Sequence, residues 1–269
     1  MEKTVIVIAA NSLSQASSGH TVTFELSPGK TKMPSTRSAS KTLWTTYVEA
    51  MTEYCRVVFD IFPDKYQVCV AAVDEQKCQP VNSWRDEDQE LSKVLLGLQK
   101  FGAPQSFPSG APGYSHLSSS LQGLHYGVKC LAQLTATQYA MSSAGSLKPP
   151  LNQGRILFFS TLKSAADVKE LERAVTNTIK SENADIKQKM DSARLPIHHC
   201  QLVIINTHTP PLLTSDIKDA PLTQHSAQFS SVVYSFPAKI LLEKCVSLAK
   251  LHFNLKTTVI TGIPMKALA

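Results

Sequence analysis

The amino-acid sequence predicts an α/β fold, with a doubly wound, mostly parallel β-sheet and helices on both faces. Short, continuous apolar runs rich in β-branched residues are typical of strands that are covered on both faces. Amphipathic helical patterns alternate with these runs, which implies right-handed crossovers between parallel strands. The 269 residues, of which 43% are hydrophobic and 18% charged, are enough to bury a sizeable core.

The predicted strands begin with TVIVIAA at residues 4–10, and we expect this apolar run to be the central strand of the sheet. Three further runs have the same character, and a fifth candidate lies near the end of the sequence: YQVCVAAV (66–73), RILFFST (155–161), CQLVIINT (200–207) and TTVITGI (257–263).

Five amphipathic segments are predicted to be helices. The first, 40–62, begins with Ser40 as its N-cap and ends before Pro63, with apolar residues at three-to-four spacing. The second, 86–102, opens with acidic residues that suit a helix N-terminus and closes at Gly102. The other three are 116–141, 165–182 and 238–254.

Segments rich in Ser, Thr and Pro are predicted to be surface loops, at 27–40, 103–115 and 207–228. No apolar run reaches about 18 residues and no secretory signal is recognisable, so we expect no membrane insertion and a cytosolic or nuclear location. The six cysteines are scattered, which favours free thiols over disulfides. The net charge of +6 is dispersed and favours polyanionic partners only weakly.

The turn after the first predicted strand is where a site is expected, because open α/β sheets bind ligands outside the carboxyl ends of their strands. In one large α/β class, an Asp at this strand end followed by two serines, D-x-S-x-S, holds a divalent cation. The corresponding residues here are Ala10, Ser12 and Ser14. Serine hydroxyls without a carboxylate cannot offset the dehydration of the ion, and Asn11 is only a neutral ligand.

A second carboxylate would be expected after RILFFST, but the next acid is Asp167, which we place inside the following helix. Because two charges are missing, the sequence predicts neither a metal ion nor another cofactor. We expect this turn to form a rim for contact with a partner, made by Asn11, Ser12, Ser14, Ser160 and Thr161.

Two other patterns are weak matches to ligand sites. FELSPGKT, at 24–31, ends like a phosphate-binding loop, but Phe24 stands where that pattern needs glycine and Pro34 obstructs the helix that should follow. HHC, at 198–200, is not followed by a second ligand pair at a spacing suited to zinc.

No catalytic set is predicted. The two S-x-x-K matches, Ser38 to Lys41 and Ser160 to Lys163, lack the other patterns of an acyl-transfer site. The residues therefore favour a binding domain without a catalytic centre. A metal-dependent ligand binder and a nucleotide-binding hydrolase are the alternatives.

Three segments resemble the Asunder family, the thirteenth subunit of the Integrator complex: LWTTYVEAMTEYCRVVFDIFP (43–63), VNSWRDEDQEL (81–91) and TTVITGIPMK (257–266). The resemblance spans nearly the whole chain and implies a von Willebrand factor A-like, Rossmann-type domain over residues 1–265, with a tail at 266–269. Family members have an Asp at the end of the first strand, where this chain has Ala9. They also continue into a β-barrel and a helical region, which do not follow Ala269 here.

The resemblance implies a non-catalytic Integrator subunit, a protein-interaction scaffold in small nuclear RNA transcription and 3′ processing. It implies a heterodimer with the paired A-domain subunit, the fourteenth, and contacts with other Integrator subunits. It also implies a role in mitosis, cell division and the cell cycle, through recruitment of dynein machinery to the nuclear envelope. The implied location is the nucleus, with a cytoplasmic or perinuclear pool, and direct nucleic acid contact is expected to be weak.

Overall fold

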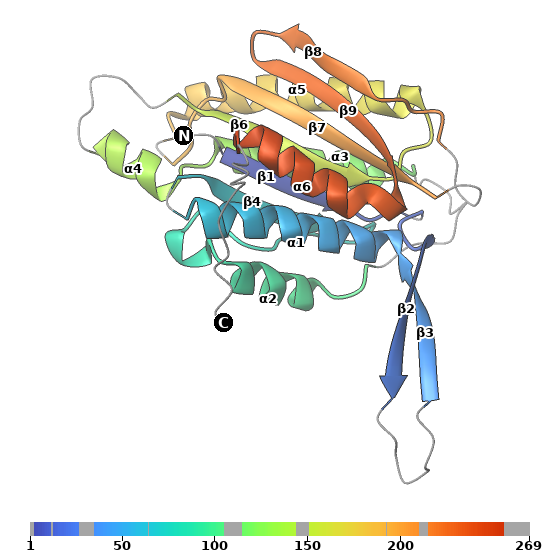
Figure 1. The fold of residues 1–269 in the computed structure, drawn as a ribbon. Helices are drawn as coiled ribbons and strands as arrows, with labels where there is room; N and C mark the ends of the chain where they lie inside the picture. The colour runs from blue at the N-terminus through green and yellow to red at the C-terminus, as the bar shows by residue number, and fades with distance from the viewer. Residues whose placement is uncertain are drawn as a thin grey trace, which may run out of the picture.

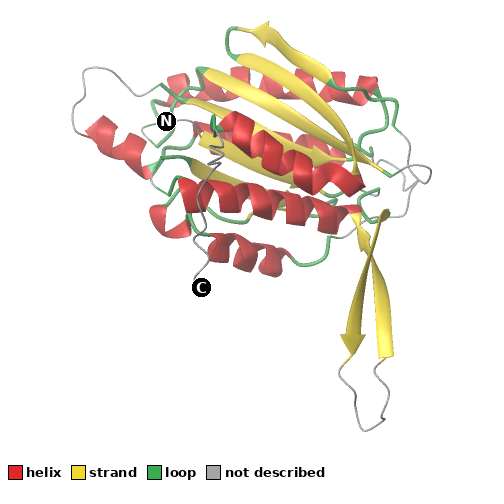
Figure 2. Cartoon of the chain, viewed as in Figure 1, coloured by secondary structure: helices red, strands yellow, loops and turns green. Residues whose placement is uncertain are grey.

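The computed structural model describes residues 3–11, 13–26, 35–63, 65–104, 115–143, 151–191, 193–209 and 215–255. Seven strands form one sheet in the order β5-β4-β1-β6-β7-β9-β8, and β2 and β3 form a separate two-stranded sheet. Helices lie on both faces of the large sheet (Figure 1 and Figure 2). The predicted doubly wound α/β fold with a mostly parallel sheet is confirmed.

Four of the five predicted strands are present, with small shifts of their ends: β1 (Lys3–Ala9), β4 (Gln67–Val73), β6 (Gln153–Ser160) and β7 (His199–His208). β1 pairs in parallel with β4 on one side and with β6 on the other, and β7 continues the sheet beyond β6. β1 and β4 are buried along their whole length, which explains their continuous apolar sequences. The fifth predicted strand, 257–263, lies outside the described residues.

Five strands have no predicted counterpart: β2 (Ser17–Leu26), β3 (Ser35–Thr42), β5 (Cys78–Pro80), β8 (Ala220–Ser226) and β9 (Phe229–Pro237). The loop predictions for 27–40 and 207–228 are therefore wrong where they overlap β3 and β8. Both strands are largely exposed and rich in polar residues. Strands of this kind lack the apolar alternation by which half-buried strands are recognised.

The sheet separates two hydrophobic cores, one on each side of β1. One core contains residues of α1 (Leu43–Ile61), α2 (Leu91–Phe101) and α6 (Leu241–His252) together with Ile6 and Ile8 of β1. The other contains residues of α3 (Ser118–Ala132) and α5 (Ala165–Lys189) together with Val5 and Val7. Successive β1 side chains thus alternate between the two cores, as the pleat of a strand requires.

The starts of the first two predicted helices are wrong for local reasons. α1 begins at Leu43 with Thr42, instead of Ser40, as its N-cap, because residues 35–42 pair with β2. The Oγ1 atom of Thr42 accepts a hydrogen bond from the backbone nitrogen of Thr45 at 3.2 Å. The second helix begins at Leu91, since Asp86–Asp88 form only a 3₁₀ turn.

The predicted helix 116–141 is divided into α3 and α4 (Ala136–Ser143). Thr135 and Gln138 start α4 by each accepting, through a side-chain oxygen, a hydrogen bond from the other's backbone nitrogen at 3.2 Å. α5 extends past its predicted end at residue 182, and within this extension Asn183 forms two hydrogen bonds with the backbone of Ile197, at 2.9 and 2.7 Å. The predicted helix 238–254 is present as a 3₁₀ turn followed by α6.

All six cysteines are free and all except Cys78 are buried, which confirms the prediction of free thiols. None of the helices in the described ranges combines the length and the apolar character that a membrane crossing requires.

Lys3 is a buried cation at the amino end of β1. Its Nζ atom donates hydrogen bonds to the carbonyl oxygen of Leu131, at 3.0 Å, and to that of Gln133. These carbonyls lie at the carboxyl end of α3, where a positive charge is favourable. Removal from water nevertheless lowers the pKa of Lys3 to about 7, because burial disfavours the charged form.

Gly123 allows close packing of α3 on β1, since a Cβ atom added there would lie 2.7 Å from Cγ1 of Val7. We expect Gly123→Ala to lower the free energy of unfolding by about 1–2 kcal/mol, because overpacking outweighs the gain in helix propensity. Urea denaturation measures the change. The control Gln122→Ala, at an exposed position of α3, should stay within about 0.5 kcal/mol of the native chain. Unchanged or increased stability of Gly123→Ala would contradict the expectation.

The stability of the native chain should rise relative to that of Lys3→Met as the pH increases from about 7 to about 10. The pKa of Lys3 is about 7 in the folded state and 10.5 ordinarily. Within this window the unfolded chain binds the extra proton, so raising the pH favours the folded state by on the order of 5 kcal/mol at most. Denaturant unfolding of both proteins at stepped pH tests this, and parallel pH profiles would refute it.

Candidate functional site

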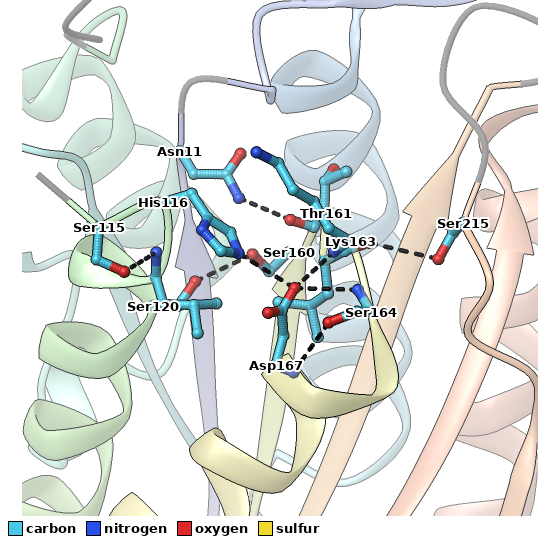
Figure 3. Close-up of polar contacts among 12 residues, drawn as sticks. Asn11, Ser115, His116, Ser120, Ser160, Thr161, Lys163, Ser164, Asp167 and Ser215 are labelled. Carbon is cyan, nitrogen blue, oxygen red and sulfur yellow. Dashed lines mark hydrogen bonds and ion pairs between the residues drawn. The ribbon is translucent and has the colours of Figure 1, made fainter. Parts of the chain in front are cut away.

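The carboxyl edge of the parallel strands is the position at which this fold binds ligands. If β2, β3 and β8 are left out and the remaining six strands are renumbered along the chain, their order across the sheet is 3-2-1-4-5-6, as in Rossmann-type folds. The direction in which the strands are added reverses between β1 and β6. A crevice at such a reversal is the general ligand position in open α/β sheets. Asn11 follows β1 here, while Ser160 and Thr161 stand at the end of β6 (Figure 3).

Asn11 joins the ends of β1 and β6 through its side-chain amide. Its Nδ2 atom donates a hydrogen bond to the carbonyl oxygen of Thr161 at 2.7 Å. Its Oδ1 atom accepts from the backbone nitrogen of Leu13 at 3.0 Å, and its own carbonyl oxygen accepts from Oγ of Ser14 at 2.8 Å. Both ends of the amide are thus hydrogen-bonded, one within the turn and one to the end of β6, and a neutral group bridges the two strand ends.

Hydroxyl groups from the flanking helices complete the edge. Tyr47 of α1 forms a hydrogen bond with Oγ1 of Thr161, and Ser120 of α3 lies with its Oγ atom 3.2 Å from Oγ of Ser160. Burial raises the pKa of Tyr47, so this phenol stays neutral. The two helices are therefore fixed to the end of β6 without any charged side chain.

The predicted rim residues lie inside this edge. Asn11, Ser14, Ser160 and Thr161 are each at most 1% exposed. Their polar atoms form hydrogen bonds with neighbouring groups of the protein, among them Tyr47 and Ser120. Ser12 lies outside the described residues.

Asp167 is the third residue of α5, inside the helix as expected, and caps its start. Its Oδ2 atom accepts hydrogen bonds from the backbone nitrogens of Lys163 and Ser164 at 2.8 and 3.1 Å, and Nε2 of His116 lies 3.1 Å away (Figure 3). Burial opposes ionisation, but His116 and the backbone donors outweigh it and lower the pKa of Asp167.

Asn206 is a polar centre of the edge that sequence reasoning missed. It is fully buried near the end of β7, and its Oδ1 atom accepts from the backbone nitrogen of Leu162 at 2.9 Å. Its Nδ2 atom donates to Oγ of Ser215 and Oγ of Ser235, each at 3.0 Å. An Asn within the apolar run CQLVIINT was the available signal, because a buried amide requires hydrogen-bond partners.

Asp74, directly after β4, is a second missed residue at this edge. It is fully buried, and its Oδ1 atom accepts from the backbone nitrogens of Gln76 and Lys77 at 2.9 and 2.8 Å. This oxygen is therefore engaged in the turn between β4 and β5. Within the described ranges, no three His, Cys, Asp or Glu side chains gather in a way that could hold a metal ion.

The weaker sequence patterns lie elsewhere. Phe24 is on β2, whereas residues 27–31 of FELSPGKT are outside the described part of the chain. The HHC pattern is at the start of β7, where Nδ1 of His198 accepts from the backbone nitrogen of Asn152 at 3.3 Å. Ser38 is on β3, and Lys41 pairs with Glu49 at 2.6 Å. Among the hydrogen bonds and ion pairs of the described residues, none joins these residues to Asn11, Ser160 or Thr161.

A family model described as the cell cycle and development regulator Mat89Bb matches residues 1–267. Integrator complex subunit 13 of Xenopus laevis and that of Homo sapiens are each 36% identical to the chain, over 84% of this chain and 31% of their own length. Protein asunder of Drosophila willistoni is 31% identical over 84% of this chain and 32% of its own length. The chain thus spans about a third of the length of these relatives.

Two solved structures show a more distant likeness. The SpRpn10 VWA domain has a TM-score of 0.44 and 12% identity, with 92% of this chain and 94% of that chain covered. The N-terminal domain of TFIIH p34 has a TM-score of 0.42 and 8% identity, with 91% and 96% covered.

The family match covers nearly the whole sequence, and its relatives include Integrator complex subunit 13 and protein asunder, which confirms the resemblance to the Asunder family. The chain belongs to the family of the cell cycle and development regulator Mat89Bb.

Proposed function

We propose that this chain is a non-catalytic subunit of the Integrator complex and acts there as a protein-interaction scaffold. The observation that carries this proposal is the 36% identity, over 84% of the chain, to proteins named Integrator complex subunit 13. The carboxyl edge supports the non-catalytic part of the proposal, because neutral hydrogen bonds within the protein occupy the position at which the fold would hold a ligand.

The proposal includes a heterodimer with the fourteenth Integrator subunit, contacts with other subunits, and a nuclear location with a cytoplasmic or perinuclear pool. We place its activity in small nuclear RNA transcription and 3′ processing, with weak nucleic acid contact. The family description supports a role in the cell cycle, for which we propose dynein recruitment to the nuclear envelope in mitosis. We assign these roles to one von Willebrand factor A-like domain at 1–265, followed by a tail at 266–269.

The exposed side chains around the carboxyl edge are the surface that we propose for contact with a partner subunit. Gln15 and Lys163 are exposed beside the buried pair Asn11 and Thr161, and Asp216 is exposed next to Ser215. The backbone beneath these residues is held by the hydrogen bonds of Asn11 and Asn206. A rigid base of this kind presents its exposed side chains to a partner with little loss of conformational entropy on binding.

Precipitation of the tagged chain from nuclear extract should recover Integrator subunits, the fourteenth among them. The double variant Gln15→Glu, Lys163→Glu should recover at least about tenfold less, because it makes the proposed surface, which has one cation and one anion, strongly negative. Quantitative mass spectrometry of the precipitates measures both results.

Lys129→Glu is the control for this experiment, since Lys129 is exposed on α3. It should recover the same amount of Integrator subunits as the native chain. Absence of all Integrator subunits from the native precipitate would overturn the proposed function. Equal losses in the double variant and in Lys129→Glu would contradict the proposal that the carboxyl edge is the contact surface, but not the proposal that the chain is an Integrator subunit.

Calorimetric titration with Mg²⁺ and with Ca²⁺ separates the scaffold from a metal-dependent ligand binder. We expect no heat above that of dilution up to about 1 mM ion, because such ions require several oxygen ligands, carboxylates among them. The residues that follow β1 and end β6 supply hydroxyl and amide groups that already form hydrogen bonds within the protein. A saturable heat that disappears in Asp167→Asn would instead establish a cation site at this edge.

A further inference from the structure

The β2–β3 hairpin is an arm that projects from the body of the molecule (Figure 1). Its two strands pair with each other and with no other strand of the described chain. The arm is fixed at its base, where the backbone nitrogen of Leu43 donates to the carbonyl oxygen of Ala16 at 2.9 Å and Oγ of Ser18 donates to that of Lys41 at 3.0 Å. Beyond this base, each strand presents an outer edge that no other strand of the described residues occupies.

The strand register gives the arm two chemically different faces. Val22 lies opposite Ala39, and Phe24 lies opposite Arg37. Because side chains alternate along a strand and cross-strand partners share a face, these four residues form one face, which we call the apolar face. The other face carries only hydroxyl groups around the centre of the arm, with Thr21 opposite Ser40 and Thr23 opposite Ser38.

The apolar face is uncovered. Val22 is 41% exposed and Phe24 is 44% exposed, while Arg37 and Ala39 are exposed as well. An isolated two-stranded hairpin in water is marginal, and three strands or a covered apolar face are needed for a stable sheet. The arm therefore resembles an incomplete sheet: a third strand and a cover over the apolar face would stabilise it.

The charge of the arm indicates which kind of partner would complete it. Residues 17–42 contain four Lys or Arg and one acid. Lys41 is paired with Glu49, whereas no acid of the described residues pairs with Arg37 on the apolar face. β3 carries both of these cations and no acid, so its outer edge is the more positive of the two.

We propose that the arm is a docking site for an extended, acidic segment of a partner protein. The segment adds to the outer edge of β3 as a third strand, through main-chain hydrogen bonds. Its apolar side chains cover Val22 and Phe24, and an acidic side chain pairs with Arg37. A polypeptide fits better than a nucleic acid, because the described part of the arm offers one phenyl ring, one imidazole ring and one unpaired guanidinium, instead of a row of stacking and phosphate-binding groups.

The test uses the intact chain and a fluorescein-labelled heptapeptide of alternating Glu and Val, followed by fluorescence anisotropy. Two further probes are the matched Lys and Val heptapeptide and a single-stranded oligouridylate. Arg37→Glu should weaken binding of the acidic peptide about tenfold and create binding of the basic peptide, since the charge across the face is reversed. Phe24→Ser should weaken binding of the acidic peptide about fivefold, through the loss of apolar contact.

Lys169→Glu is the control with a matched charge change, because Lys169 is exposed on α5. It should bind the acidic peptide within about twofold of the native chain. Circular dichroism melting of each variant verifies that the body of the molecule stays folded. The proposal is overturned by equal losses in Arg37→Glu and Lys169→Glu, by absence of binding up to about 1 mM peptide, or by an oligouridylate that binds more tightly than the acidic peptide.

Discussion

The simultaneous pairing of β1 with β4 and β6 is the constraint on which the rest of the structure depends. It places β1 inside the sheet, with one hydrophobic core on each side. α3 can approach β1 closely because Gly123 and Gly127 present no side chain to Val7. The same pairing aligns the ends of β1 and β6, and so brings Asn11 within hydrogen-bond distance of Thr161, 150 residues later in the chain.

A neutral amide at this position changes what the sheet edge can do. Carboxylates from two strand ends would repel each other and would require a cation between them. The Asn11 amide joins the same two ends directly, by donating to a backbone carbonyl, and Tyr47 and Ser120 attach the helices with uncharged hydroxyl groups. The edge is therefore held by the protein itself, which suits a rigid surface for protein contact more than a site that changes with the binding of an ion.

The proposed roles use two surfaces of different character. The carboxyl edge belongs to the body of the fold, where buried hydrogen bonds fix the backbone. The β2–β3 arm stands outside the body and exposes both of its faces. The match to the Mat89Bb family covers nearly the whole chain, while the chain itself spans only about a third of the length of its relatives. The two proposed surfaces have no residue in common.

The sequence by itself determined the parts of this protein whose signals are local. The runs at 4–10, 66–73, 155–161 and 200–207 are strands because they are buried on both faces, and such burial leaves a continuous apolar pattern. The missing acids at the first turn could also be read directly. β3 and β8 could not be predicted, because polar, exposed strands leave no such pattern and depend on the strand beside them.

Only the tertiary structure decided how the site residues are used. Asn11 and Thr161 appear in the sequence as candidates for a surface, and the fold buries them against each other. The role of Asn206 emerges only when Leu162, Ser215 and Ser235 surround it. Hydrogen bonds of this kind connect segments that are far apart in the chain, and the alignment of strand ends that creates them is a property of the sheet as a whole. The sequence determines which groups are available, and the strand order determines which of them meet.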